Sequence, residues 1–248
     1  MIILKTQQDL KKMRKSGQVT AAVLSLMGAL AKPGLTTAEL DRSAEDLILR
    51  MGAIPAFKGY LDYPATLCTS LNDEVIHGIP GSRILEEGDI LSIDTGAVLD
   101  GYYSDSAITL PIGEVSPEAA KLIERTRAAL EAGIAAALSG GRLGDIGFEV
   151  QKTAEAAGFS VVREYVGHGI GRKMHESPNV PNYGTKGTGT GLSAGMTIAI
   201  EPMVNQFGRE VAVDSDGWTV RTRDGGLSAH FEHTVAITDE GPYLLTVL

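Results

Sequence analysis

Apolar residues recur at the spacing of an amphipathic helix in two pairs of segments. Leu10, Met13 and Val19 illustrate the pattern in the first segment. Recurrence every three to four residues predicts α-helices, and proline and glycine mark where they end. Such breakers stand between the members of each pair, in "KPG" and in "SGG". The four helices predicted in this way cover residues 6–31, 37–52, 116–138 and about 145–158.

Strand-like segments follow each helix pair, and the order repeats along the chain. The stretch "GDILSIDTG", which begins at Gly88, matches "GMTIAIEPM", which begins at Gly195. The sequence therefore predicts two copies of a helix–helix–strands unit, related by a pseudo-two-fold axis. The copies cover about residues 1–113 and 114–248 of a single domain, residues 1–248.

Each copy carries two acidic residues at matching strand positions. The alignment places Asp94 on Glu201 and Asp105 on Glu232. A turn at a strand end would explain Asp94 alone, and a solvated edge would explain Asp105 alone. Two matched pairs instead favour a shared role for all four carboxylates.

The first acidic pair lies in a predicted β-hairpin. Asp100 and Gly101 form a strong two-residue turn signal. In that register Asp94 faces Ala107, and Asp105 is its diagonal neighbour on the same face, roughly 7–8 Å away. Converging carboxylates on a buried face repel one another, which a cation would relieve. Two divalent ions suit four acids better than one.

The chain has five histidines, and three lie in loops marked by glycine or proline. His168, in "VGHGIG", is predicted to be a metal ligand because glycines allow close backbone approach. His77 and His175 are predicted to act as acid/base groups beside the metal, since imidazole titrates near neutral pH. His230 and His233 flank Glu232, and we expect both to be structural and to point to the opposite face.

Composition narrows the class of protein. Of 248 residues, 43% are hydrophobic and 21% are charged, with a net charge of -9, so no basic nucleic-acid footprint is present. Cys68 is the single cysteine, which excludes an internal disulfide. The longest apolar run, residues 19–31, is too short to span a membrane, and the N-terminus lacks the apolar run of a signal peptide. We expect a soluble cytoplasmic protein.

Five motifs together give the whole chain a family resemblance. They are "NDEVIHGIP", "GDILSIDTGAVLDGYYSDSA", "GHGIGRKMHESP", "IAIEPM" and "SAHFEHT". With them, the chain closely resembles the type I methionine aminopeptidases, which have the α+β pita-bread fold shared with aminopeptidase P and creatinase. The resemblance implies a central antiparallel sheet inside the pseudo-two-fold repeat. The short spacing from His175 to Glu201 favours type I over type II, and the N-terminus indicates a minimal, bacterial-style enzyme.

The resemblance also implies residue roles. Asp105 and Glu232 would bridge two ions about 3.5 Å apart. Glu201 would also accept a proton from the attacking water, and His77 and His175 would contact the scissile peptide. The five implied metal ligands are Asp94, Asp105, His168, Glu201 and Glu232.

The implied activity is removal of an N-terminal methionine that precedes a small residue. The cofactors would be two divalent ions (Co, Mn, Fe, Zn or Ni) and a monovalent cation, Na or K, near Asn72, Glu74 and Ser228. Met174 stands where many members of the family have phenylalanine.

The implied partners are N-terminal peptides of nascent proteins and the ribosome, for a monomer with no nucleic-acid or membrane binding. The implied methionine pocket contains Tyr60, Tyr63, Cys68 and Trp218.

Three other interpretations remain open. The chain could be an Xaa-Pro aminopeptidase or creatinase relative on the same fold, although those usually carry a further N-terminal domain. It could be a non-catalytic pita-bread module that binds peptides, although such relatives generally lose metal ligands. The acids could hold calcium without catalysis, but calcium prefers oxygen ligands, and His168 argues against it.

Overall fold

The computed structural model describes residues 2–248, and it contains the four predicted helices. Thr6 and Thr36 cap the first two helices with their side chains, and Ser116 caps the third just before Pro117. The helices are α1 (Gln7–Leu30), α2 (Thr37–Arg50), α3 (Pro117–Ala136) and α4 (Leu143–Ala156).

The fourth helix begins slightly earlier than the sequence pattern predicts. Asp145 was the expected start, but α4 begins at Leu143. Asp145 instead lies in the first turn, where its Oδ2 accepts a hydrogen bond of 2.7 Å from the backbone N–H of Arg142. An acidic residue at this position satisfies an otherwise free helical N–H, so it marks the inside of the helix rather than its cap.

A nine-stranded sheet forms the centre of the molecule. Its strand order is β1-β4-β5-β14-β9-β7-β8, with β2 also paired to β4 and β15 also paired to β14. All of the registered pairs are antiparallel. These strands are β1 (Ile54–Pro55), β2 (Leu67–Leu71), β4 (Ile90–Leu99), β5 (Tyr102–Pro111), β7 (Gly167–Gly169), β8 (Glu176–Val180), β9 (Thr197–Ile200), β14 (Glu232–Thr238) and β15 (Gly241–Leu244).

Two three-stranded sheets complete the β structure. Their orders are β13-β10-β6 and β11-β12-β3. A short 3-10 turn, η1 (Tyr60–Asp62), precedes β2. The strands are β3 (Glu74–Ile76), β6 (Ser160–Val161), β10 (Met203–Asn205), β11 (Val211–Val213), β12 (Val220–Thr222) and β13 (Ser228–His230).

The predicted hairpin is confirmed in detail. Strands β4 and β5 pair so that Asp94 faces Ala107 and Asp105 faces Gly96. Asp100 and Gly101 both have positive φ, at 52° and 75°, as the two-residue turn requires. The sequence therefore fixes which face of the sheet both aspartates share.

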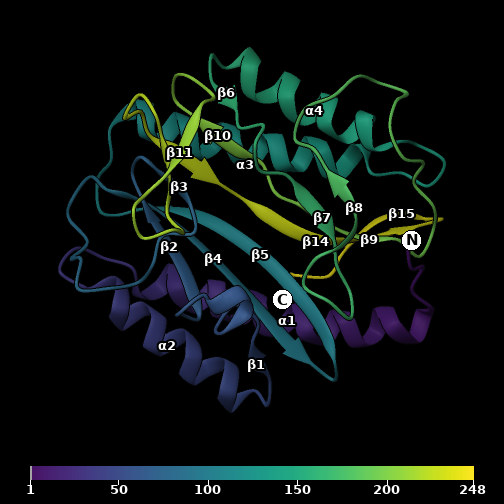
Figure 1. The fold of residues 1–248 in the computed structure, drawn as a ribbon, viewed down its shortest axis with the longest axis horizontal. Coiled ribbons are helices and arrows are strands. Elements are labelled where there is room, and N and C mark those ends of the chain that lie inside the picture. The colour runs from purple at the N-terminus through teal and green to yellow at the C-terminus, as the bar shows by residue number, and fades with distance from the viewer. Residues whose placement is uncertain (1) are drawn as a thin grey trace.

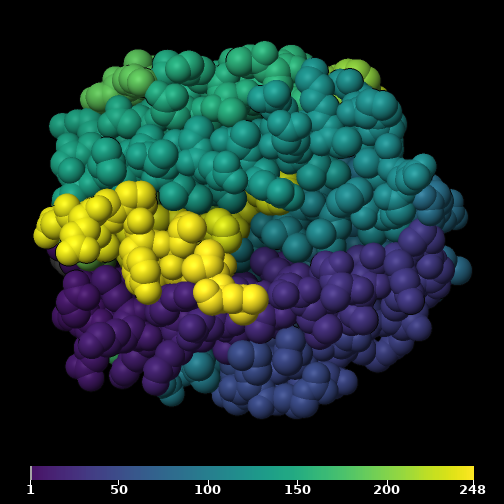
Figure 2. Space-filling view, turned by 180° about the vertical axis from the view of Figure 1, so that it is seen from behind, coloured from purple at the N-terminus to yellow at the C-terminus, as the bar shows by residue number. Residues whose placement is uncertain are grey.

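Both helix pairs cover the same face of the curved sheet, the one at the rear in Figure 1, with α1 and α2 along its lower part and α3 and α4 along its upper part. Each pair has its own apolar cluster: one joins α1 and α2 to β2 and β4, and the other joins α3 and α4 to β9 and β14. From behind, the C-terminal segment crosses between the two helix pairs (Figure 2). There a Cβ on Gly17 of α1 would lie 1.9 Å from the carbonyl oxygen of Leu245, so the close packing requires glycine.

The order helix, helix, strands occurs in both halves, as the repeat predicts. In the second half, the segment between β9 and β14 includes β10 to β13, which explains why its two acids lie further apart in the sequence. No helix within residues 2–248 combines the length and the apolar character needed to cross a bilayer.

Candidate active site

One cavity of about 190 Å³ is lined by all of the residues expected in the divalent-metal, catalytic and methionine-binding sites, whereas Asn72, Glu74 and Ser228, expected near a monovalent cation, lie outside its lining. Both halves of the chain contribute to its wall. Its base is acidic and its remaining wall is largely aromatic and apolar. The predicted residues that line it are Tyr60, Tyr63, Cys68, His77, Asp94, Asp105, His168, His175, Glu201, Glu232 and Trp218.

The four carboxylates converge because their strands are neighbours in the central sheet. Asp94 is on β4, Asp105 on β5 and Glu232 on β14, while Glu201 directly follows β9. These strands lie in the order β4-β5-β14-β9, so acids that are far apart in sequence share one face. Asp105 and Glu232 are buried, with 4% and 2% of their surfaces exposed.

His168, on β7, completes this cluster. Its Nε2 lies 3.5 Å from Oε1 of Glu201 and 3.7 Å from Oδ2 of Asp105. Its Nδ1 lies 2.8 Å from the carbonyl oxygen of Gly169, which can only accept a hydrogen bond. Nδ1 therefore carries the proton, and the lone pair of Nε2 faces the carboxylates, as a metal-ligating imidazole requires.

The carboxylates are short of partners within the protein. Within residues 2–248, Oδ1 of Asp94, Oδ1 of Asp105 and Oε1 of Glu232 are buried without a hydrogen-bond partner. Buried polar atoms of this kind are costly. Three unpaired oxygens beside the free lone pair of His168 form a donor set that suits a first-row divalent metal ion.

The electrostatics of the cluster lead to the same interpretation. Burial, and then the charge of Asp105, raises the pKa of Asp94 well above its ordinary value. Burial raises the pKa of Asp105 to about 7. Burial also raises the pKa values of Glu201 and Glu232, with Asp105 as the next cause. Ionised carboxylates destabilise this site when no cation is bound, so bound cations should stabilise the fold.

Divalent metal should therefore raise the melting temperature of the stripped protein. An ion at 100 times its Kd stabilises a native state by about 2.7 kcal/mol. For a chain of this length that corresponds to roughly 5–10 °C. Differential scanning fluorimetry with Mn²⁺, compared with NaCl at the same ionic strength, measures the shift. Equal melting temperatures in the two solutions would contradict a metal site.

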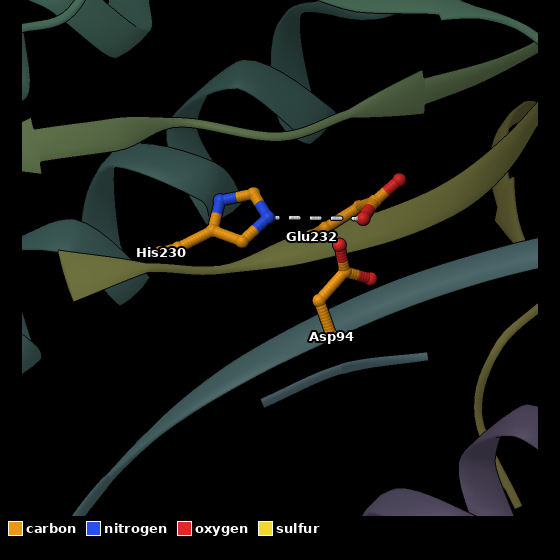
Figure 3. A group of neighbouring side chains, drawn as sticks. All are labelled: Asp94, His230 and Glu232. Atoms are coloured by element: carbon orange, nitrogen blue, oxygen red, sulfur yellow. Dashed lines mark ion pairs between the residues drawn. The ribbon is translucent and has the colours of Figure 1, made fainter. Parts of the chain in front are cut away.

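His230 occupies a different place from the one predicted. We expected its side chain to point to the face opposite Glu232, and this prediction is wrong. Its Nε2 lies 3.9 Å from Oε2 of Glu232, and the two side chains form one group with Asp94 (Figure 3). Residues two apart in an extended chain point to the same face, and the prediction overlooked this. His233, one residue from Glu232, does point away, and its Nδ1 lies 2.8 Å from Oγ1 of Thr246.

His175 stands between the acidic cluster and the aromatic wall. Its Nδ1 lies 2.8 Å from the hydroxyl of Tyr60, and its ring centroid is 4.2 Å from that of His168. Burial, and then His168, lowers the pKa of His175 to about 4. The imidazole is therefore neutral near pH 7.

His77 is held in an uncommon backbone conformation, with φ of 61°. Non-glycine residues in this region are strained, and such strain is frequent at functional sites. Its ring lies edge-on to Trp218 and Tyr165, with centroid distances of 6.1 and 5.9 Å. Burial lowers the pKa of His77 to about 4, so this imidazole is also neutral near pH 7.

The remaining wall is suited to an apolar side chain. Tyr63 lies edge-on to Trp218 at 5.0 Å, and its hydroxyl lies 3.0 Å from the carbonyl oxygen of Leu67 and 3.1 Å from that of Gly78, the two acceptors open to its one proton. Burial raises the pKa of the Cys68 thiol, which stays protonated and packs as a small apolar group. The residue that departs from the family pattern, Met174, also lines the cavity. Wall residues that the sequence reasoning missed are Phe57, Leu61, Ile76, Tyr165 and Val166.

Comparison with known proteins agrees with this geometry. The family model described as metallopeptidase family M24 matches residues 11–239. The chain is 52% identical to a methionine aminopeptidase of Clostridium acetobutylicum, over 100% of this chain and 99% of that protein. It is 49% identical to methionine aminopeptidase 1 of Bacillus subtilis, over 99% of each chain.

The chain belongs to metallopeptidase family M24.

Solved structures related to this M24 chain agree on the fold. A methionine aminopeptidase of Thermotoga maritima superposes with a TM-score of 0.99 at 44% identity, over 100% of both chains. A prolidase of Pyrococcus furiosus superposes with a TM-score of 0.80 at 23% identity, over 99% of this chain and 66% of the prolidase, a likeness of fold alone. The predicted α+β pita-bread fold is confirmed.

Proposed function

We propose that this M24 chain is a type I methionine aminopeptidase, which removes an N-terminal methionine when the next residue is small. The observation that carries the proposal is the shared cavity, in which four carboxylates and His168 lie beside a wall of Tyr63, Cys68 and Trp218. The carboxylates attract a free ammonium group, which selects the end of a peptide. The apolar wall suits the thioether of methionine. Relatives at 49–52% identity carry the same activity in their names.

We assign the divalent metal to Asp94, Asp105, His168, Glu201 and Glu232. The support is the convergence of these side chains and the unpaired oxygens of Asp94, Asp105 and Glu232. Bound divalent ions would supply a Lewis acid that lowers the pKa of a water molecule and polarises the scissile carbonyl.

The other steps belong to side chains of this protein. Glu201 accepts the proton of the attacking water, a role that suits a buried carboxylate with a raised pKa. His77 and His175 are neutral imidazoles that can each donate one hydrogen bond, so we assign them to the developing oxyanion and the leaving amine. Tyr60 supports His175 through its hydroxyl.

We also propose the finer features implied by the resemblance. A monovalent cation would bind backbone oxygens near Asn72, Glu74 and Ser228. The carboxylate of Glu74 already pairs with Arg83 and Arg221 at 2.8 and 2.6 Å, which leaves the main chain as the source of ligands. The protein would act as a cytoplasmic monomer on nascent chains at the ribosome.

The proposal predicts that His77→Ala lowers kcat by about 100-fold, because one group that stabilises the transition state is lost. Bound metal should stay unchanged, since His77 is absent from the proposed ligand set. Steady-state kinetics and elemental analysis measure the two quantities. His233→Ala, on the opposite face of β14, is the matched control and should keep the wild-type kcat. Loss of metal from His77→Ala would instead make His77 a ligand.

The alternative that the sequence leaves open is an Xaa-Pro aminopeptidase on the same fold. A pool of peptides beginning Met-Gly, Met-Ala, Met-Lys, Leu-Gly and Ala-Pro separates the two activities by mass spectrometry. Loss of methionine only before glycine and alanine supports the proposal. Cleavage of Ala-Pro would replace it with the proline-specific activity, and absence of any cleavage with metal bound would indicate a peptide-binding module.

A further inference from the structure

The segment that leads into α1 reaches across the fold to the loop that carries His175. The ammonium group of Lys5 donates to Oε2 of Glu176 at 2.6 Å, across 171 positions of sequence. Both side chains are almost fully buried, with 5% and 7% of their surfaces exposed. Glu176 directly follows His175 and begins β8. A buried ion pair thus joins the N-terminal segment to the neighbour of a proposed active-site residue.

Glu176 also forms hydrogen bonds within the loop that carries His175. Its Oε1 accepts backbone hydrogen bonds from Arg172 at 2.8 Å and from Lys173 at 3.2 Å. Both carboxylate oxygens are therefore in use, one within the loop and one toward Lys5. The position of Glu176 is coupled to the course of the backbone between Arg172 and His175.

Lys5 is itself fixed to the body of the protein. Its backbone N–H donates to the carbonyl of Gly195 at 2.7 Å, in the turn before β9, and the N-terminal segment descends beside β9 in Figure 1. A Cβ on Gly171 would lie 2.5 Å from Cε of Lys5, so the aliphatic stem of the lysine rests on the loop backbone. The ammonium group of Lys5 is therefore held in a fixed position beside the loop, unlike the mobile charge of a surface lysine.

A second contact ties the same loop to α1. The guanidinium of Arg172 donates to the hydroxyl of Tyr102 at 2.7 Å and lies 4.5 Å above its ring. The hydroxyl of Tyr102 in turn donates to Asp9 in the first turn of α1. Residues 5 and 9 thus hold the loop at two points.

We propose that Lys5 is a positioning residue for His175, which acts through Glu176. A buried ion pair contributes little net stability compared with apolar packing, but removal of one partner leaves the other uncompensated. Without the ammonium group, Glu176 would move toward water and carry the adjacent backbone with it. His175 would then lose its alignment with the hydroxyl of Tyr60, 2.8 Å away, and with the cavity. This inference rests on the proposed role of His175 in the aminopeptidase reaction.

The variant Lys5→Met tests the inference because methionine keeps most of the stem but lacks the charge. We expect kcat to fall by about 10- to 100-fold, the effect of a small misplacement of an active-site group. KM and bound metal should stay unchanged. In a His175→Ala background, Lys5→Met should have no further effect on kcat, because the group that it positions is gone.

A spectroscopic measurement makes the test independent of activity. In NMR spectra of protein with isotope-labelled histidine, Lys5→Met should change the chemical shifts of the His175 ring and leave those of the His233 ring unchanged. Lys186→Met, which removes a surface ion pair with Glu149 of 2.6 Å, is the matched control and should change neither signal nor kcat.

Unchanged His175 signals in Lys5→Met would overturn the inference. Equal fold losses of kcat in the wild-type and His175→Ala backgrounds would overturn it too, because they indicate a merely structural role. A wild-type protein that cleaves no Met-Ala peptide with metal bound would contradict the proposed function, and the His175 signals would still decide whether Lys5 positions the loop.

Discussion

Glu201→Gln should give a folded protein that has lost nearly all of its aminopeptidase activity. Glutamine keeps a neutral oxygen that can face the metal, but it cannot accept the proton of the attacking water. Loss of a general base lowers kcat by about 10²- to 10⁴-fold. Glu201 is the acid for which this effect is expected, because it follows β9 at the edge of the cluster, 3.5 Å from Nε2 of His168, and lines the open cavity.

The measurement is kcat on a Met-Ala peptide with saturating Mn²⁺, together with bound metal and melting temperature. Glu240→Gln, in an exposed turn of the same chain, is the matched control and should behave as the wild type. A Glu201→Gln protein that turns over at the wild-type rate would rule out the role of Glu201 as proton acceptor. If Glu201→Gln loses both bound metal and activity, the loss of activity would be explained by metal binding alone, without a role for Glu201 as proton acceptor.

Asp105→Asn should have opposite effects on metal affinity and on the stability of the stripped protein. Asp105 is 4% exposed, and its Oδ1 has no partner within residues 2–248. Asparagine removes one negative charge from a buried cluster that repels itself, so the stripped variant should melt at a higher temperature than the stripped wild type. The same change removes a charged ligand. Metal affinity should fall by more than the roughly 10- to 100-fold loss typical of a residue that only supports a ligand.

Calorimetric titration with Mn²⁺ and thermal melting of both stripped proteins measure these effects. Asp100→Asn is a suitable control in the same hairpin, because asparagine tolerates the positive φ of 52° in the turn. Unchanged metal affinity in Asp105→Asn would exclude the proposed role of Asp105 as a metal ligand. A lower melting temperature of the stripped variant would mean that Asp105 stabilises the fold by other contacts.

Much of the site follows from local sequence signals. The Asp100-Gly101 turn sets the register of β4 and β5, and the period of two then places Asp94 and Asp105 on one face. The internal repeat extends this argument to Glu201 and Glu232. These inferences succeed because turn chemistry and strand alternation are local and strong.

Other features depend on contacts that the sequence does not encode locally. The pairing of β14 with both β5 and β9, which brings the four acids together, joins segments more than 100 positions apart in the first case. The ion pair of Lys5 with Glu176 has no sequence signal, because a lone lysine near a terminus is usually solvated. Tyr165 and Val166 enter the cavity through the packing of a loop. His230 is a different case, because its spacing of two from Glu232 indicates a shared face, and the prediction of the opposite face overlooked this local signal.

The central claim is that the buried acids form a divalent metal centre on which peptide cleavage depends. The most direct measurement is a titration of the stripped protein with Mn²⁺ that follows bound metal and cleavage of a Met-Ala peptide in the same samples. The account predicts no turnover without metal and a rise in turnover that parallels occupancy, with up to two ions bound per chain. Full turnover by the stripped protein, or metal binding that survives replacement of Asp105, would contradict it.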